Sequence, residues 1–286
     1  GAVTGLAAGG AGNCWVATAA SGAFLVSAGG IERHETFAST IGGLRSDTLR
    51  CAFMDREGVV WFGGDRGASR FDTRGSESRL VGPDANGDVV RSISRTAGQL
   101  WVGTNRGLVT GESATALAPV AGLEGRTVFD VETAPDGRLL AATQQGVFVA
   151  AAAHRGSPVF TPLDAADGSV DIRGRAIAAM GSTAYVGTFG AGLLRLDGDA
   201  LRNVDFVGAG DSLRDIVCLH VDNTETMWIG TAGRGAYRCD SAGLTPLDSE
   251  TLAGRTIYAI AGSESATLWF ATNSGLVVRD GAVEAR

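Results

Sequence analysis

The sequence predicts an all-β protein that folds as a single seven-bladed β-propeller, with four antiparallel strands in each blade. Three observations lead to this prediction: a short motif that recurs seven times, the placement of every tryptophan within that motif, and an abundance of glycine. The chain has 286 residues, of which 43 are Gly, 6 are Pro and 44% are hydrophobic. A chain of this length can bury a substantial core within one all-β domain.

The recurring motif is an aromatic or apolar pair, a small residue, Thr, a short polar turn and then Gly. All five tryptophans of the chain occupy the central position of this motif. These anchor positions, spaced 39 to 46 residues apart, are Trp15, Trp61, Trp101, Leu140, Tyr185, Trp228 and Trp269. A period of this length is typical of propeller blades. We expect the anchor residues to pack between neighbouring blades and not to contact a ligand.

Each repeat divides into four short strands. An apolar strand such as 127–131 is followed by a turn such as 55–58, the anchor strand, a Gly-led third strand such as 192–196 and a looser fourth segment. One four-stranded sheet cannot bury both of its apolar faces, whereas seven sheets packed in a ring bury every face. The predicted blades cover approximately residues 1–37, 38–82, 83–121, 122–165, 166–207, 208–249 and 250–286.

The first repeat begins at its inner strand, near residues 3–7, and the last ends within a short fourth strand, near residues 282–286. We therefore expect the two ends of the chain to meet between the first and seventh blades. The sequence leaves open whether a terminal strand is exchanged to latch the ring.

The best-preserved repeats, at residues 55–71, 98–109 and 222–238, follow the pattern Asp-x-x-Gly-x-Leu/Val-Trp-Val/Ile-Gly-Thr and then Gly-Leu-x-Arg. This pattern resembles the two-component-regulator propeller repeat, which builds the ligand-binding sensor regions of many bacterial hybrid histidine kinases. The resemblance implies a bacterial ligand-binding propeller with a periplasmic or extracellular location. The motif is structural, so the resemblance implies no catalytic residues.

Composition narrows the classes of function. The net charge of −7 disfavours a nucleic-acid binder. The sequence contains no stretch of 18 or more apolar residues, so we expect no membrane insertion. All 24 basic residues are Arg, which excludes lysine Schiff-base chemistry. The four cysteines match neither a disulfide framework nor a zinc site, so we expect free, mostly buried thiols. We expect a monomer with no metal and no cofactor. The chain begins without a signal-peptide pattern, so a cytoplasmic location stays open.

In a propeller, the loops before the inner strands and the loops between the second and third strands reach the same face, where ligands usually bind. Two residues before the first apolar position of each inner strand, the sequence places Gly1, Asp47, Asp88, Arg126, Arg175, Arg214 and Arg255. The second set of loops adds Arg66, Arg106 and Arg234. The planar guanidinium suits carboxylate, sulfate or phosphate groups.

We therefore predict a ligand-binding site for a small molecule or glycan, with an anionic ligand favoured. Its predicted residues are Arg126, Arg175, Arg214, Arg255, Arg106 and Arg234. The alternative is that these arginines pair with loop carboxylates such as Asp47, Asp88 and Asp215, or brace adjacent blades.

Two other functions stay open, and catalysis is not the favoured one. Asp130, Glu132 and His220 lie at inner-strand positions that otherwise hold mostly small residues, and they could form an acid–base set for a lyase or hydrolase. This arrangement is faintly similar to the propeller lyases that open streptogramin rings, a resemblance that implies channel-side His and acidic residues with magnesium. The second alternative is a protein-interaction scaffold, or an engineered repeat protein, without a small-molecule ligand.

Overall fold

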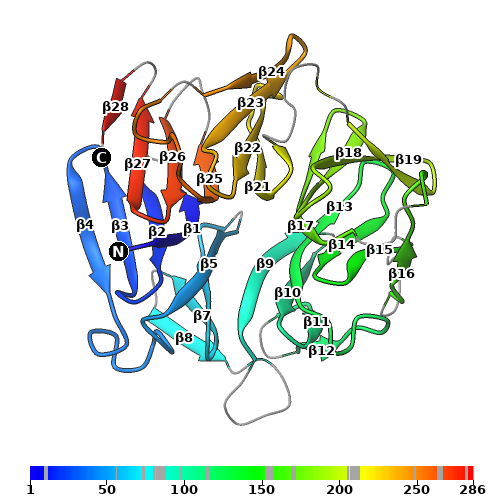
Figure 1. Ribbon diagram of the computed structural model, residues 1–286. Helices are drawn as coiled ribbons and strands as arrows, with labels where there is room; N and C mark the ends of the chain where they lie inside the picture. Colours follow the sequence, from blue (N-terminus) through cyan, green and yellow to red (C-terminus); the bar gives the residue numbers. More distant parts are fainter. Residues whose placement is uncertain are drawn as a thin grey trace.

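The computed structural model of the chain is a ring of seven four-stranded antiparallel sheets, which confirms the predicted seven-bladed β-propeller (Figure 1). It describes residues 1–9, 12–55, 57–72, 75–79, 81, 88–96, 98–113, 116–151, 158–168, 172–204, 206, 213–247, 249–262, 267–280 and 283–285. Within these ranges, no helix is long and apolar enough to cross a membrane.

The strands of each blade follow one another in the chain and in the sheet. The inner strands, which surround the centre of the ring in Figure 1, are β1 (Val3–Ala8), β5 (Leu49–Met54), β9 (Val90–Thr96), β13 (Val128–Thr133), β17 (Gly174–Met180), β21 (Ile216–Val221) and β25 (Ile257–Gly262). The second strands, which contain the anchor residues, are β2 (Cys14–Thr18), β6 (Val60–Gly64), β10 (Gln99–Thr104), β14 (Leu139–Thr143), β18 (Thr183–Thr188), β22 (Met227–Thr231) and β26 (Thr267–Thr272).

The two remaining strands of each blade lie toward the rim of the ring. The third strands are β3 (Ala23–Ser27), β7 (Gly67–Asp72), β11 (Gly107–Gly111), β15 (Gly146–Ala150), β19 (Leu193–Asp197), β23 (Ala236–Asp240) and β27 (Gly275–Asp280). The outer strands are β4 (Gly30–Glu35), β8 (Gly75–Arg79), β12 (Ala118–Pro119), β16 (Thr161–Leu163), β20 (Ala200–Asn203), β24 (Gly243–Pro246) and β28 (Val283–Ala285).

The Thr and Gly of the repeated motif close the loop between the second and third strands. The hydroxyl of Thr104 donates to the carbonyl of Gly107 at 3.0 Å, and Thr231 donates to Gly235 at 2.7 Å. Thr18, Thr143, Thr188 and Thr272 make the same bond in their blades. The same bond thus closes six of the seven loops, over three residues in some blades and four in others. In each case it provides a partner for the buried Thr hydroxyl and for the Gly carbonyl.

The anchor residues pack between blades, as predicted. Trp101 is 2% exposed and lies in a core cluster with Leu123, Val128 and Val131, which belong to the next blade or the segment leading to it. Trp228 packs in the same way against Ile257 and Phe270 of the seventh blade. Burial of large aromatic side chains dominates the stability of cores of this kind.

A small residue directly before the motif's Thr allows adjacent blades to approach closely. A Cβ atom added to Gly103 would lie 2.8 Å from the carbonyl oxygen of Val128 in the next blade, and closer still to the hydroxyl of Ser92. Gly187 meets Ile216 of the next blade in the same manner. At these positions the motif requires Gly or Ala for steric reasons.

The ring closes by packing between the first and last blades. Trp269 of β26 lies in one core cluster with Val3, Leu6 and Val16 of the first blade. β28 pairs with β27, its predecessor in the chain, and β1 pairs with β2. Each sheet is thus built from one continuous segment, and the question of a latching strand is answered: none of the seven sheets exchanges a strand.

We expect Gly103→Val to lower the free energy of unfolding by about 1–3 kcal/mol or more, because the added side chain collides with backbone of the neighbouring blade. Urea denaturation would measure this change. Gly29→Val is the matched control, since Gly29 is exposed and its nearest neighbour is the Ser27 hydroxyl at 3.7 Å. Equal stability of the two variants would contradict the packing role of Gly103.

Candidate functional site

One face of the ring collects the beginnings of the inner strands and the loops between the second and third strands. In the first blade, Val3 at the start of β1 pairs with Thr18 at the end of β2, and in the last blade Ile257 pairs with Thr272. Both kinds of loop therefore leave the sheet at the same end. We call this end the loop face.

Every inner strand carries a β-bulge at the loop face. In β9, Val90 pairs with Thr104 and Ser92 pairs with Gly103, which leaves Arg91 as the extra residue. The same register shift recurs in all seven blades, and its extra residues are Thr4, Arg50, Arg91, Phe129, Arg175, Val217 and Tyr258. We call these seven residues the bulge ring. Bulges re-aim side chains and are common beside binding sites.

The register corrects one element of the sequence alignment. Arg126, Arg214 and Arg255 each stand two residues before the first paired residue of their inner strands, as expected. Arg175 does not, because β17 begins at Gly174 and Arg175 is its bulge residue. The alignment slipped by three residues because Gly174 replaces the apolar residue with which the other inner strands begin. Arg175 is therefore equivalent to Arg50 and Arg91, two arginines that the sequence analysis missed.

The predicted arginines differ in their partners. Arg106 pairs with the buried carboxylate of Asp88 at 3.5 Å, and the Nε of Arg214 donates to the carbonyl of Gly190 at 3.1 Å, which braces adjacent blades. Arg126 and Arg175 lie over aromatic rings instead, Arg126 at 4.7 Å from the centroid of Phe148 and Arg175 at 4.0 Å from that of Phe129.

Arg234 is exposed in its loop, and Arg255 has a buried Nη1 atom with no hydrogen-bond acceptor among the described residues. Asp47, proposed as a partner for these arginines, instead accepts the backbone N–H of Phe37 at 2.7 Å. In the part of the chain that the structure describes, the predicted pairing with loop carboxylates holds for Arg106 and for none of the other five arginines.

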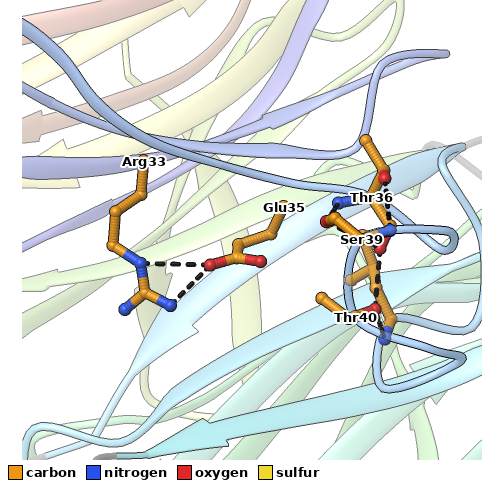
Figure 2. Close-up of polar contacts among 6 residues, drawn as sticks. Arg33, Glu35, Thr36, Ser39 and Thr40 are labelled. Atoms are coloured by element: carbon orange, nitrogen blue, oxygen red, sulfur yellow. Dashed lines mark hydrogen bonds and ion pairs between the residues drawn. The ribbon is translucent and has the colours of Figure 1, made fainter.

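The connection between β4 and β5 presents apolar side chains on the loop face. Figure 2 shows its beginning, where the Thr36 N–H donates to the Ser39 hydroxyl at 2.8 Å and the Thr40 hydroxyl donates to the Thr36 carbonyl at 2.7 Å. This network holds Ile41, 95% exposed, in a left-handed backbone conformation with φ 53°. Phe37 and, elsewhere on this face, Phe189 and Tyr258 are also exposed.

Asp130 and Glu132 lie on β13 and use their carboxylates for local and cross-blade hydrogen bonds. Asp130 accepts the N–H of Ile177 in the next blade at 2.8 Å and the N–H of Val131 at 2.9 Å. Burial, with a smaller contribution from the nearby Glu132, raises its pKa to about 7 against the effect of the two hydrogen bonds. Burial likewise raises the pKa of Glu132, which accepts the N–H of Thr133 at 2.9 Å.

His220 lies on β21, two blades away from Asp130. Its Nε2 lies 2.7 Å from the carbonyl of Gly262 in the next blade, and burial lowers its pKa, so the ring is a neutral donor at neutral pH. Asp222 is the charged group that acts on it. Among the contacts of the described residues, none joins His220 to Asp130 or Glu132, so the structure does not assemble the three as one acid–base set.

The four cysteines are free thiols, as expected. Burial raises the pKa of Cys14, Cys51 and Cys218 to about 12, which keeps these thiols protonated and unreactive. Within the described ranges, no group of three or more His, Cys, Asp or Glu side chains is arranged to hold a metal ion.

Comparison with known proteins places the chain by fold alone. No protein-family model matches it, and no curated protein matches its sequence. Among solved structures, it is similar to a streptogramin B lyase, with 13% identity, a TM-score of 0.74 and coverage of 96% of this chain and 92% of that chain. It is also similar to the WD40 propeller domain of Doa1, with 10% identity, a TM-score of 0.68 and coverage of 100% and 93%.

A third similar structure is the extracellular domain of a putative hybrid two component system, BT4673, from B. thetaiotaomicron. Identity is 15% and the TM-score is 0.51, with coverage of 98% of this chain and 46% of that chain. At these identities the three structures support a seven-bladed propeller fold, and they share no single activity.

Stability should depend on pH through Asp130. The folded protein keeps a proton on this carboxyl up to pH about 7, whereas the unfolded chain releases it near its ordinary pKa of 3.8. The contribution of this proton to stability is therefore complete below pH 3.8 and is lost as the pH rises through about 7. Asp130→Asn removes this dependence. Between pH 4 and 8, the free energy of unfolding of the wild type should therefore fall relative to that of the variant as the pH rises.

The matched control is Asp136→Asn. Hydrogen bonding to Arg138 lowers the pKa of the exposed Asp136 carboxyl. The contribution of the ionised carboxylate to stability is therefore retained as the pH rises. Urea denaturation at several pH values measures both differences. A pH-independent difference for Asp130→Asn would show that its carboxyl titrates normally.

Proposed function

We propose that this protein is a ligand-binding propeller that takes an anionic small molecule or an acidic glycan on its loop face. One observation supports this most directly: on a chain with a net charge of −7, five of the six predicted arginines lack a carboxylate partner within the described residues. Those that contact an aromatic ring, Arg126 and Arg175, keep the N–H edge of the guanidinium for another acceptor.

The sensor-like repeat supports a place among bacterial sensor propellers. The repeated Trp-Val-Gly-Thr pattern, seen at 101–104, serves blade packing and loop closure, so it is compatible with a ligand held by the variable loops. The fold similarity to the extracellular domain of a two component system agrees with this proposal. We further propose a monomer that does not bind nucleic acid and does not insert into a membrane, with the periplasmic or extracellular location that likeness to the sensor propellers implies.

The lyase alternative rests on fold similarity to a streptogramin B lyase and on three residues whose polar atoms bond to backbone. The scaffold alternative has its own support in the exposed Phe37 and Ile41 on the same loop face. Of the three functions, anion binding is favoured because the loop face combines uncompensated positive charge with aromatic surfaces.

Calorimetric titration with glucuronate and glucose, a charged and an uncharged sugar of the same shape, tests the proposal. We expect binding of the acid but not of glucose, weakening as sodium chloride is raised from 50 to 500 mM because salt screens the guanidinium groups. Arg126→Gln should weaken binding by about three- to tenfold. A wider panel of carboxylates, nucleotides and sulfated sugars would follow, and failure of every anion in it would overturn the proposed function.

A further inference from the structure

We propose that Arg50, Arg91 and Arg175 of the bulge ring form a binding site for a tetrahedral dianion, a sulfate or phosphate group, on the loop face near the centre of the ring. This inference rests on the proposed function and deepens it, because it names the residues that hold the ligand and the group that they recognise. It differs from the site predicted from the sequence, which contains only Arg175 of the three.

The first support is the register. Arg50 in β5, Arg91 in β9 and Arg175 in β17 are the extra residues of their bulges, so the backbone places all three at one level of the ring. Their inner strands surround the ring centre (Figure 1). Three arginine positions, in the second, third and fifth blades, thus lie at the loop-face ends of inner strands on one side of the ring.

The second support is the packing of the side chains. Between Arg91 and Arg175 lies the bulge residue of the fourth blade, Phe129, and the guanidinium of Arg175 stacks on its ring at 4.0 Å. This contact holds the guanidinium of Arg175 beside the bulge residue of the neighbouring blade. The Nε atoms of Arg91 and Arg175 are both buried, and neither has an acceptor among the residues described. A buried donor without a partner is costly in a native protein and calls for an external acceptor such as an ion.

The third support is the electrostatic setting. Burial lowers the pKa of Arg91 and of Arg175, and like charge adds to both shifts: Arg50 acts on Arg91, and Arg91 acts on Arg175. No carboxylate contributes to either shift. Asp130, the acidic residue of the neighbouring strand, is already bonded to the backbone of Ile177. Among the described residues, no carboxylate offsets the repulsion between these arginines, and a bound anion would do so.

The chemistry of the site favours a dianion. The two negative charges of a dianion neutralise the half-buried cations Arg91 and Arg175. The tetrahedral oxygens of sulfate or phosphate can accept hydrogen bonds from several guanidinium groups at once. The remaining bulge-ring residues, Thr4, Val217 and Tyr258, are uncharged, and Tyr258 is 38% exposed. The part of the ligand that faces these three residues should accordingly be uncharged, as in a sulfated or phosphorylated sugar.

The test uses sulfate, phosphate and chloride at equal ionic strength, followed by calorimetry and by thermal unfolding. We expect sulfate and phosphate, but not chloride, to raise the melting temperature of the wild type. Arg91→Gln and Arg175→Gln should each weaken dianion binding by about ten- to hundredfold. Without the anion, each variant should be as stable as the wild type or more stable, because a repulsive charge is removed.

Arg33→Gln is the control, since Arg33 pairs with Glu35 on the outer strand of the first blade (Figure 2), and it should leave dianion binding unchanged. Arg91→Lys keeps the positive charge but loses the planar guanidinium with its paired N–H donors, and it should weaken dianion binding at least threefold. If dianion binding survives in both Gln variants but falls in Arg126→Gln, the bulge-ring site is refuted while the proposed function stands.

Two further outcomes also refute the bulge-ring site. One is a loss of several degrees in melting temperature in both Gln variants with unchanged dianion binding, which would make the arginines structural. The other is an absence of sulfate and phosphate binding in the wild type. If glucuronate still binds in that case, only this inference fails, and if no anion binds, the proposed function fails with it.

Discussion

Each blade is held to the next by the close approach of a small residue in its second strand to the first residue of the following inner strand. At several of these contacts the sizes of the two residues are complementary. Gly63 faces Val90 and Gly230 faces Ile257, so glycine meets a β-branched side chain. Where the second strand carries Ala142, the next inner strand begins with Gly174. Tight packing at this point sets the blade separation on which the rest of the ring depends.

This constraint explains how far the sequence could predict the structure. The seven repeats alone predict the blade number and the strand order, since the motif's large anchor and the small residue before its Thr recur wherever two blades meet. The bulges left no comparable mark, because the extra residue is free to be Thr, Arg, Phe, Val or Tyr. The slip at Arg175 arose because β17 begins with Gly174, which packs against Ala142 of the preceding blade, so the apolar residue expected there is absent.

The inner strands also use their polar residues to join neighbouring blades. Ser94 donates to the carbonyl of Val131, Thr4 donates to that of Leu49, and Asp130 accepts from Ile177. Because each of these bonds crosses from one blade to the next, polar side chains near the axis satisfy backbone groups that packing would otherwise leave unpaired. The carboxylate of Asp130 and the imidazole of His220 take part in the same kind of contact, each bonding to a backbone group of the next blade. Arg91 and Arg175 differ from them in keeping buried donors without acceptors in the described structure.

The absence of strand exchange among the seven sheets has a consequence for the evolution and engineering of this ring. Every sheet is one continuous stretch of chain, and the contact between the first and last blades is made by side chains, as at Trp269 and Val16. A cut between any two blades, with the present ends joined, would leave all strand pairings intact. The fold is accordingly suited to circular permutation, and whole blades can be duplicated or replaced as units without breaking a hydrogen-bonded sheet.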